Sequence, residues 1–264
     1  MIGVRSHAVL LLAVLAGILV LSFFGLLSGD IPTEFSDLYP ALLDYSSQDL
    51  NQVIIREIRL PRIMMAIISG AGLSVAGMLM QTLFQNPLAG PYVLGINSGS
   101  SLMVALGVLS GVGFFNSELG LIGSALLGAF VFGLFILFTA SFLRNQIGLL
   151  LFGVMLGSFV SAIITILEAG SQAEALKSFA LWSMGSLNNV TVEQIPMIFS
   201  VFIITCFLTF FIIKPLNILV LGEEECRLMG YDIKKIRILI VFITALFTGL
   251  ITAFCGPIAF VGLA

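Results

Sequence analysis

Charged residues are scarce in this chain of 264 amino acids. Lys, Arg, Asp and Glu together make up 9% of it, whereas ordinary globular domains contain about 25% of these residues. Hydrophobic residues account for 59%, which is more apolar surface than a water-soluble fold could hide. The net charge of -3 is also too small to indicate a nucleic-acid partner. The composition therefore excludes an ordinary soluble domain and predicts a membrane protein.

Cysteine and histidine are also rare in this chain, with three and one residues. Cys206, Cys226 and Cys255 are scattered, with neither a metal-ligand spacing nor a disulfide framework, and the single histidine, His7, flanks the first apolar run. The chain has no G-x-x-x-x-G-K-[ST] phosphate loop, and no carboxylate pair or nucleophile–base set can be placed. We therefore expect a protein that is not an enzyme and that binds no metal or cofactor itself.

Long apolar runs fill most of the chain and predict an all-α, polytopic membrane helical bundle. Each run is continuous and about 20 residues long, which is the length needed to cross a bilayer as a helix. Seven complete spans are predicted, at residues 8–27, 61–84, 92–111, 119–142, 147–168, 194–213 and 236–255. We interpret the first as an uncleaved signal anchor, because its apolar core exceeds that of a signal peptide.

An eighth apolar segment begins at Pro257, and the printed sequence stops at Ala264. A helix this short cannot cross a bilayer, so we expect the start of an eighth span in a chain that lacks its natural C-terminal part. Residues 1–264 are predicted to form a single transmembrane domain that is incomplete at this end. A short polar segment, 214–235, lies within it.

The Lys and Arg residues of the loops favour an N-terminus on the inner side of the membrane. With this orientation the inner side carries Arg5, Arg144, Lys214, Arg227, Lys234, Lys235 and Arg237. The outer side carries Arg56, Arg59, Arg62 and Lys177. The polar segment at 214–235 then lies in the cytoplasm.

Small residues recur at four-residue spacing within the predicted spans. They are Gly72 and Ala76, Gly95 and Gly99, Ser124 and Gly128, and Gly153 with Gly157 and Ser161. Such faces let helix backbones approach closely in lipid, where close packing replaces the hydrophobic effect. We expect tight packing within the bundle, or in places the border of a translocation path.

The motif RLPR, from Arg59 to Arg62, opens the second predicted span, and Arg56 precedes it. Pro61 suits the first turn of a helix, where its missing N–H costs nothing. Because Arg59 and Arg62 are three residues apart, we expect them on one side of the helix start. They either anchor lipid headgroups and pair with Glu57, or contact an acidic patch on an external partner.

The connection between the second and third spans reads QTLFQNPLAGPYVLGINSG. Pro87 and Pro91 end one helix and start the next. Polar side chains near or inside the membrane either form hydrogen bonds between helices or face a wet cavity. The candidates for a translocation path are Gln81, Asn86, Pro87, Gly95 and Asn97.

The most informative segment is a charged, helix-prone island at 214–237, KPLNILVLGEEECRLMGYDIKKIR. Gly222 predicts a break, after which three glutamates fall in the first turn of a helix, where the dipole favours negative charge. Gly230 predicts a C-terminal stop, and Asp232 can cap the next helix. The pattern predicts two short helices joined by a turn.

The island also presents apolar side chains for contact, from Leu219, Leu221, Leu228 and Met229. The rest of the chain is embedded in the membrane. A compact polar segment on one side of it is suited to contact with a soluble partner that moves the segment. The alternative interpretation is an ordinary solvated cytoplasmic loop.

Four motifs occur in a recognisable order: RLPR, QNPLAGP with LGINSG, LWSMGSLNN at 181–189, and LNILVLGEEECRLMG at 216–230. From about residue 8 to Ala264 the chain resembles the FecCD/BtuC-type (iron-siderophore and vitamin B12) permeases of type II ABC importers. The resemblance implies a ten-span fold that works as a homodimer or heterodimer of permeases. It also implies two ATPase subunits, which bind ATP and Mg²⁺, and a soluble extracytoplasmic substrate-binding protein.

The resemblance also implies roles for particular residues. Arg59 and Arg62, with Arg56 beside them, resemble the arginines that meet glutamates on the binding protein. Trp182 to Leu187 resembles a short outer segment between spans five and six. The coupling helices that sit in a groove of the ATPase are matched by the segment from Leu221 to Gly230, with Leu221, Gly222, Glu223, Glu224, Glu225, Cys226 and Gly230 as the site residues.

The function implied by the resemblance is that of a permease subunit in the inner (plasma) membrane, driven by a separate ATPase. A ferric siderophore is the first expected substrate, followed by haem, cobalamin or an oxyanion such as molybdate. Two alternatives remain open. One is an ion-driven secondary transporter, for which Glu168 is the acidic candidate near a span. The other is a shortened paralogue or scaffold that does not transport.

Overall fold

The computed structural model describes residues 4–43, 45–46, 48–110, 117–143 and 146–263. Helices dominate the described residues, which include no strand. Arg144, one of the predicted inner cations, lies outside them. The chain separates into two compact units. Unit 1 is Met1–Ile67 with Val190–Pro196, and unit 2 is Ile68–Asn189 with Met197–Ala264.

Unit 1 is built around the N-terminal apolar helix and the start of the second long helix. Its elements are α1 (Val4–Leu27), α2 (Phe35–Leu43), α3 (Leu50–Val53), the π-helix η1 (Ile54–Arg59), the first turns of α4 (Leu60–Phe84) and the 3-10 turn η5 (Val192–Gln194). A small core of Leu38, Ala41 and Ile55 packs against Leu26 and Leu27 at the end of α1. None of the most apolar stretch of α1 is buried. This exposure suits a helix whose solvent is lipid.

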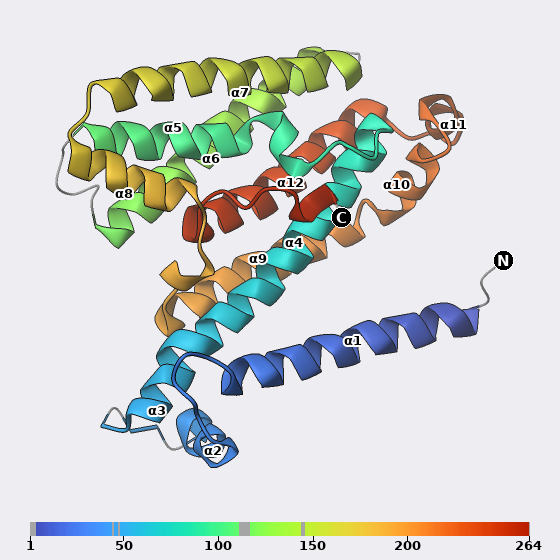
Figure 1. Cartoon of the computed structure of the whole chain (residues 1–264). Coiled ribbons are helices and arrows are strands. Elements are labelled where there is room, and N and C mark those ends of the chain that lie inside the picture. The colour runs from blue at the N-terminus through green and yellow to red at the C-terminus, as the bar shows by residue number, and fades with distance from the viewer. Residues whose placement is uncertain (1–3, 44, 47, 111–116, 144–145, 264) are drawn as a thin grey trace. The chain divides into compact units, whose positions relative to one another are not determined.

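Unit 2 contains the remaining helices (Figure 1). They are the rest of α4, η2 (Pro91–Leu94), α5 (Ile96–Leu109), α6 (Glu118–Phe142), α7 (Gln146–Ala169), α8 (Ala173–Ser183), η4 (Leu187–Asn189), α9 (Ile195–Phe210), α10 (Ile213–Leu219), α11 (Glu223–Leu228), α12 (Ile233–Cys255) and η6 (Val261–Leu263).

The helix α12 forms the centre of unit 2. In its most apolar stretch 72% of the residues are buried, against 17% for α7, so α7 is peripheral. Phe247 and Ile251 of α12 lie against Gly72 of α4, and Gly249 lies against Ala129 of α6. The helix therefore packs between α4 and α6 (Figure 1).

Each of the seven predicted spans contains a helix, and the all-α, polytopic membrane class is confirmed. Among the described residues six helices are long and apolar enough to cross a membrane, and α5 is a shorter apolar helix. The prediction was wrong about the start of α5. It begins at Ile96 rather than at residue 92, because Pro91 opens a 3-10 turn and Gly95 takes a left-handed conformation with φ of 77°. The predicted start of an eighth span is likewise not a continuous helix: between Gly256, with φ of 70°, and residue 263, the described residues form the 3-10 turn η6 and no longer helix.

Close packing through small residues is confirmed where α5 crosses α6. A Cβ atom on Gly128 would overlap the backbone of Gly99 and Ser100, and one on Gly99 would overlap Phe132. The Ser100 hydroxyl donates to the Ala125 carbonyl at 3.0 Å across the same contact. Ser161, by contrast, is exposed on α7.

Candidate functional site

The charged turn, defined as Leu221 to Gly230, folds as its sequence predicts. Gly222 has φ of 137°, and α11 begins directly after it with its three glutamates in the first turn. At the other end Gly230 has φ of 83°, and its N–H donates to the Arg227 carbonyl at 2.9 Å. The Tyr231 N–H donates to the Cys226 carbonyl at 3.1 Å. These two bonds form a Schellman motif, which ends the helix sharply.

The next helix is capped as expected. The Asp232 carboxylate accepts hydrogen bonds from the N–H groups of Lys234 and Lys235 at 3.0 and 3.4 Å. Because this cap satisfies the first free N–H groups, α12 begins at Ile233, three residues before the predicted start of the span. The charged turn is therefore fixed at both of its ends.

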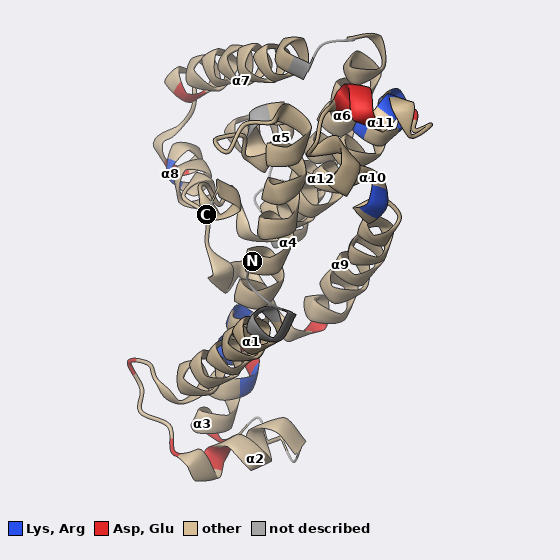
Figure 2. Ribbon diagram, turned by 90° about the vertical axis from the view of Figure 1, so that its right-hand side faces the viewer, with Lys and Arg blue, Asp and Glu red and all other residues tan. Residues whose placement is uncertain are grey.

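Apolar side chains protrude from the charged turn. Leu221, Leu228 and Met229 are 67, 88 and 60% exposed, and Glu224 and Glu225 are exposed beside them. Leu219 was expected to join this surface, but it is 1% exposed and belongs to the core of unit 2. The free surface thus combines three apolar side chains with two carboxylates. In Figure 2 charged residues gather around α11, whereas the long helices are mostly uncharged.

The inner side of α11 is anchored. Cys226 is fully buried, and burial raises the pKa of its thiol, with the charge of Glu223 adding to the effect. A Glu223 oxygen lies 3.0 Å from a guanidinium nitrogen of Arg237, which is 5% exposed. In the sequence Arg237 stands out only as an inner charge, because its distance of 14 residues from Glu223 matches no helical pairing.

A polar cleft of about 580 Å³ opens beside this ion pair. It is lined by Ser141, Phe142, Leu143, Arg227, Ile233, Lys234 and Arg237, from the end of α6, from α11 and from the start of α12. Arg237 also donates to the Leu143 carbonyl at 2.7 Å. The guanidinium therefore joins three elements at the edge of the cleft.

The predicted arginine cluster belongs to unit 1, and its members differ. Arg59 is buried, and its guanidinium donates to the Leu26 carbonyl at 2.7 Å, to the Thr33 hydroxyl at 2.8 Å and to the Ile31 carbonyl. Arg62 is exposed. The expectation that these two side chains face the same way was wrong, because Arg59 turns back onto the carbonyls that end α1, where the helix dipole favours a cation.

Arg56 differs from both Arg59 and Arg62 in its surroundings. It is partly buried, and its guanidinium lies 4.5 Å from the ring centroid of Tyr45, at the range of a cation–π contact. Of the three arginines, Arg62 is thus the one whose side chain is open to a partner.

Polar residues of the connection after α4 bond within the connection itself. Gln81 donates to the Pro87 carbonyl at 3.2 Å, and the Asn86 side chain accepts from the Leu88 N–H at 2.9 Å. Gln85 donates to the Leu219 carbonyl at 3.4 Å, which ties the end of α4 to α10 next to the charged turn. The Gln85 bond matches the interpretation as hydrogen bonding between helices, whereas the bonds of Gln81 and Asn86 are local.

The other two path candidates, Gly95 and Asn97, lie at the start of α5. A Cβ atom on Gly95 would lie 3.4 Å from the Gly153 carbonyl of α7, and Ser98 lies close to Gly157 of the same helix. Asn97 is partly buried, and its side-chain oxygen accepts no hydrogen bond from the described residues. The proposed path residues therefore fall into two separate groups.

The segment from Trp182 to Leu187 runs from the last residues of α8 to the first residue of η4, after α7 and before α9. Trp182 is buried and stacks on Phe179, with ring centroids 6.3 Å apart. The Ser186 N–H donates to the Cys255 carbonyl at 2.7 Å, so the segment is attached to the end of α12.

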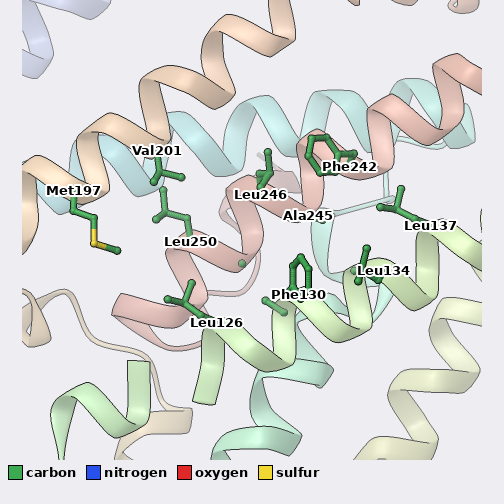
Figure 3. A pocket seen from close by; sticks show the side chains of 13 residues that line it. Leu126, Phe130, Leu134, Leu137, Met197, Val201, Phe242, Ala245, Leu246 and Leu250 are labelled. Carbon is green, nitrogen blue, oxygen red and sulfur yellow. The ribbon is translucent and has the colours of Figure 1, made fainter. Parts of the chain in front are cut away.

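An apolar groove of about 200 Å³ runs between α6, α9 and α12, and Figure 3 shows the side chains that line it. They include Phe130, Leu134, Val201, Phe242 and Leu246, without a charged residue among the lining. A groove of this kind offers no hydrogen-bonding pattern by which a polar substrate would be recognised. Glu168, the candidate for an ion-driven mechanism, lies in the last turn of α7.

Among the described residues, the apolar helices, the glycine-mediated packing and the charged turn are those of a polytopic membrane protein. The chain belongs to the FecCD transport family, whose model matches residues 15–264. Membership of this family implies association with ATPase subunits and with the membrane.

Curated relatives are transport permeases. The hemin transport system permease protein HmuU of Yersinia pestis is 34% identical over 230 residues, covering 85% of this chain and 68% of that protein. The ferric enterobactin transport system permease protein FepG of Escherichia coli is 29% identical, and the match covers 98% of this chain and 78% of that protein. The vitamin B12 import system permease protein BtuC of Klebsiella pneumoniae is 35% identical, and the match covers 80% of this chain and 63% of that protein.

A solved inward-facing structure of a metal-chelate type ABC transporter has the same fold. Its TM-score is 0.83 at 28% identity, with 96% of this chain and 78% of that chain covered. The chain thus spans about two thirds to three quarters of the length of the relatives that it matches.

Proposed function

We propose that residues 1–264 form one permease domain of an ABC importer in the inner (plasma) membrane, with the N-terminus in the cytoplasm. The domain works as a homodimer or heterodimer with a second permease. It imports a metal-containing compound, using ATP and Mg²⁺ bound by two separate ATPase subunits. The chain itself catalyses no reaction and binds no cofactor.

The observation that carries this proposal is the charged turn. It is held rigidly by a Schellman motif, an N-cap and a buried ion pair, yet it exposes Leu221, Leu228 and Met229. A rigid, protruding apolar surface with flanking carboxylates is suited to insertion into a groove of a partner. This surface supports the proposal that the coupling residues, with 214–235 as the coupling helices, contact the ATPase.

The proposed substrate is a ferric siderophore, with haem, cobalamin and molybdate as further candidates. The relatives named for hemin, ferric enterobactin and vitamin B12 are 34, 29 and 35% identical to this chain, so identity does not rank the substrates. All three are metal chelates, and the aligned structure is of metal-chelate type. The binding protein, rather than the permease, would then carry most of the selectivity.

On the outer side we propose that the binding protein docks at Arg62, with the partly buried Arg56 as a further contact. Arg62 is exposed, and an arginine fork suits the carboxylates of an acidic patch. Arg59 contributes by holding the start of α4 to the end of α1 through its three hydrogen bonds.

The test is uptake by proteoliposomes that contain the permease, its ATPase and its binding protein. Uptake of a ferric siderophore should require ATP and should stop when the P-loop lysine of the ATPase is replaced. Replacing Glu224 and Gly230 together should keep ATP hydrolysis but reduce uptake at least tenfold. Uptake that proceeds without ATP, or that is driven by an ion gradient, would refute the proposed function.

A further inference from the structure

Arg237 occupies an unusual position for a cation at the end of a membrane bundle. It is the fifth residue of α12, and 5% of it is exposed. One nitrogen lies 3.0 Å from the carboxylate of Glu223 on α11, and the other donates to the carbonyl of Leu143, directly after α6, at 2.7 Å. A single buried side chain thus joins the ends of three helices.

The physical cost of burial makes this junction difficult to break. A buried guanidinium is tolerated only when it is paired and hydrogen-bonded, and removal of one partner leaves an uncompensated buried charge. Here a carboxylate neutralises the charge, and the carbonyl at the C-terminal end of α6 adds the favourable dipole. The Glu223 carboxylate is 28% exposed, so water screens the pair only in part.

The neighbouring ion pairs do not share these properties. Arg227 lies 4.0 Å from the same Glu223 carboxylate, but its side chain is 70% exposed. Lys235 lies 3.8 Å from Asp232, with its side chain 84% exposed. Exposed pairs of this kind contribute little to stability, because water screens them and long side chains lose entropy on pairing.

The cleft marks where this link lies. Its lining includes Leu143 at the end of α6, Arg227 on α11, and Ile233 and Lys234 at the start of α12. Elsewhere α6 packs directly on α12, and Cys226 of α11 is buried in the same core. At the edge of the cleft the Arg237 guanidinium adds a polar link, because it bonds to both the Leu143 carbonyl and the Glu223 carboxylate.

We propose that Arg237 is a positioning residue that couples the charged turn to α6. When the ATPase displaces α11, Glu223 pulls the guanidinium, and the guanidinium carries the end of α6 with it. The turn, the start of α12 and the end of α6 therefore move as one piece between discrete packed states. This inference rests on the proposed function, since it needs a partner that moves the turn.

The test compares Arg237→Gln with Lys177→Gln in the complete transporter. Both changes remove one positive charge from unit 2, but Lys177 is exposed on α8 and lies outside the charged turn and the coupling helices. Arg237→Gln should leave ATPase association and ATP hydrolysis within about twofold of wild type while uptake per ATP falls at least tenfold. Lys177→Gln should keep the wild-type ratio of uptake to ATP hydrolysis.

A distance measurement supplies a readout that a merely structural role would not change. Spin labels at Leu228→Cys and Phe142→Cys report the separation of α11 from the end of α6. In the wild-type background this separation should stay constant between the nucleotide-free and the ATP-bound, vanadate-trapped states. In the Arg237→Gln background it should change between the two states.

If Arg237→Gln alone fails to fold, the double variant Glu223→Gln, Arg237→Gln removes both charges and avoids a lone buried ion. It should fold and associate with the ATPase but remain uncoupled. Normal uptake per ATP in a folded variant without the ion pair would overturn the inference, as would a wild-type separation that changes with nucleotide. Absence of ATP-dependent uptake in the wild-type transporter would instead refute the proposed function.

Discussion

At the scale of the residue, the crossing of α5 and α6 depends on glycines that have no room for a side chain. Gly128 on α6 faces the backbone of Gly99 and Ser100, whereas a Cβ atom on Gly123 of the same helix would meet nothing within 4 Å. The two positions therefore form a matched pair in which only the packing differs.

We expect Gly128→Ala to lower the free energy of unfolding by about 1–3 kcal/mol, because the methyl group forces the two helices apart. Gly123→Ala should leave it unchanged or raise it by up to about 1 kcal/mol through helix propensity. Thermal unfolding of the purified variants in detergent measures both effects. Equal melting temperatures for the two variants would contradict the proposed packing.

Cys226 offers a second prediction at this scale. Because burial and then Glu223 raise the pKa of its thiol, the reactive thiolate is rarer at pH 7–8 than for an ordinary cysteine, whose pKa is about 8.5. In a background with Cys206→Ala and Cys255→Ala, maleimide should therefore label Cys226 slowly, and the rate should still be rising above pH 8.5. An added cysteine at the exposed Met229 is the positive control, and equal rates at the two sites would contradict the burial.

At the scale of the element, the junction between α1 and the π-helix η1 is held by Arg59. The π-helix ends at this residue, and its guanidinium satisfies the carbonyls of Leu26 and Ile31. The same motif, RLPR, exposes Arg62 one turn later. One sequence motif thus serves both internal packing and an open surface.

Arg59→Gln should lower the free energy of unfolding by about 2 kcal/mol or more, because each hydrogen bond from a charged donor contributes about 1.5–3 kcal/mol. Arg62→Gln should leave stability within about 0.5 kcal/mol of wild type, since its side chain is exposed. It should instead weaken the affinity of the binding protein at physiological salt. The two measurements are thermal unfolding and a binding titration, and an unchanged melting temperature for Arg59→Gln would contradict its internal role.

Sequence patterns predicted the ends of elements well where the signal is local. Gly222, Gly230 and Asp232 act through backbone groups only a few residues away, and each takes the predicted role. The prediction for Leu219 was wrong, because whether a leucine next to a turn is exposed depends on what packs against it. The break at Gly95 was missed since an apolar run hides a left-handed residue.

At the scale of the whole molecule, the loop charges predict opposite sides of the membrane for the charged turn and for α8. Leu228 is 88% exposed on the turn, and Lys177 is exposed on α8. A cysteine at either position is therefore accessible to a water-soluble reagent.

In spheroplasts, a membrane-impermeant maleimide should label Lys177→Cys without treatment and Leu228→Cys only after the membrane is permeabilised. The physical reason is the excess of Lys and Arg in the loops predicted to be cytoplasmic. Western blots of a tagged protein verify that both variants reach the membrane in equal amounts. Labelling of Leu228→Cys in intact spheroplasts would place the turn outside and remove the proposed ATPase contact.

The amino-acid sequence by itself determined the membrane class, the positions of the helices and the shape of the charged turn. Apolar run length, caps and glycines act over one or two turns of the chain, so they can be read without knowledge of what lies nearby. Tertiary structure alone decided the partners of Arg59 and Arg237, which are the buried arginines among the described residues. Arg59 reaches Leu26 across 33 residues, and Arg237 reaches Leu143 across 94. Such long-range pairs depend on which helices pack together, and the cost of burying a charge then selects the partner.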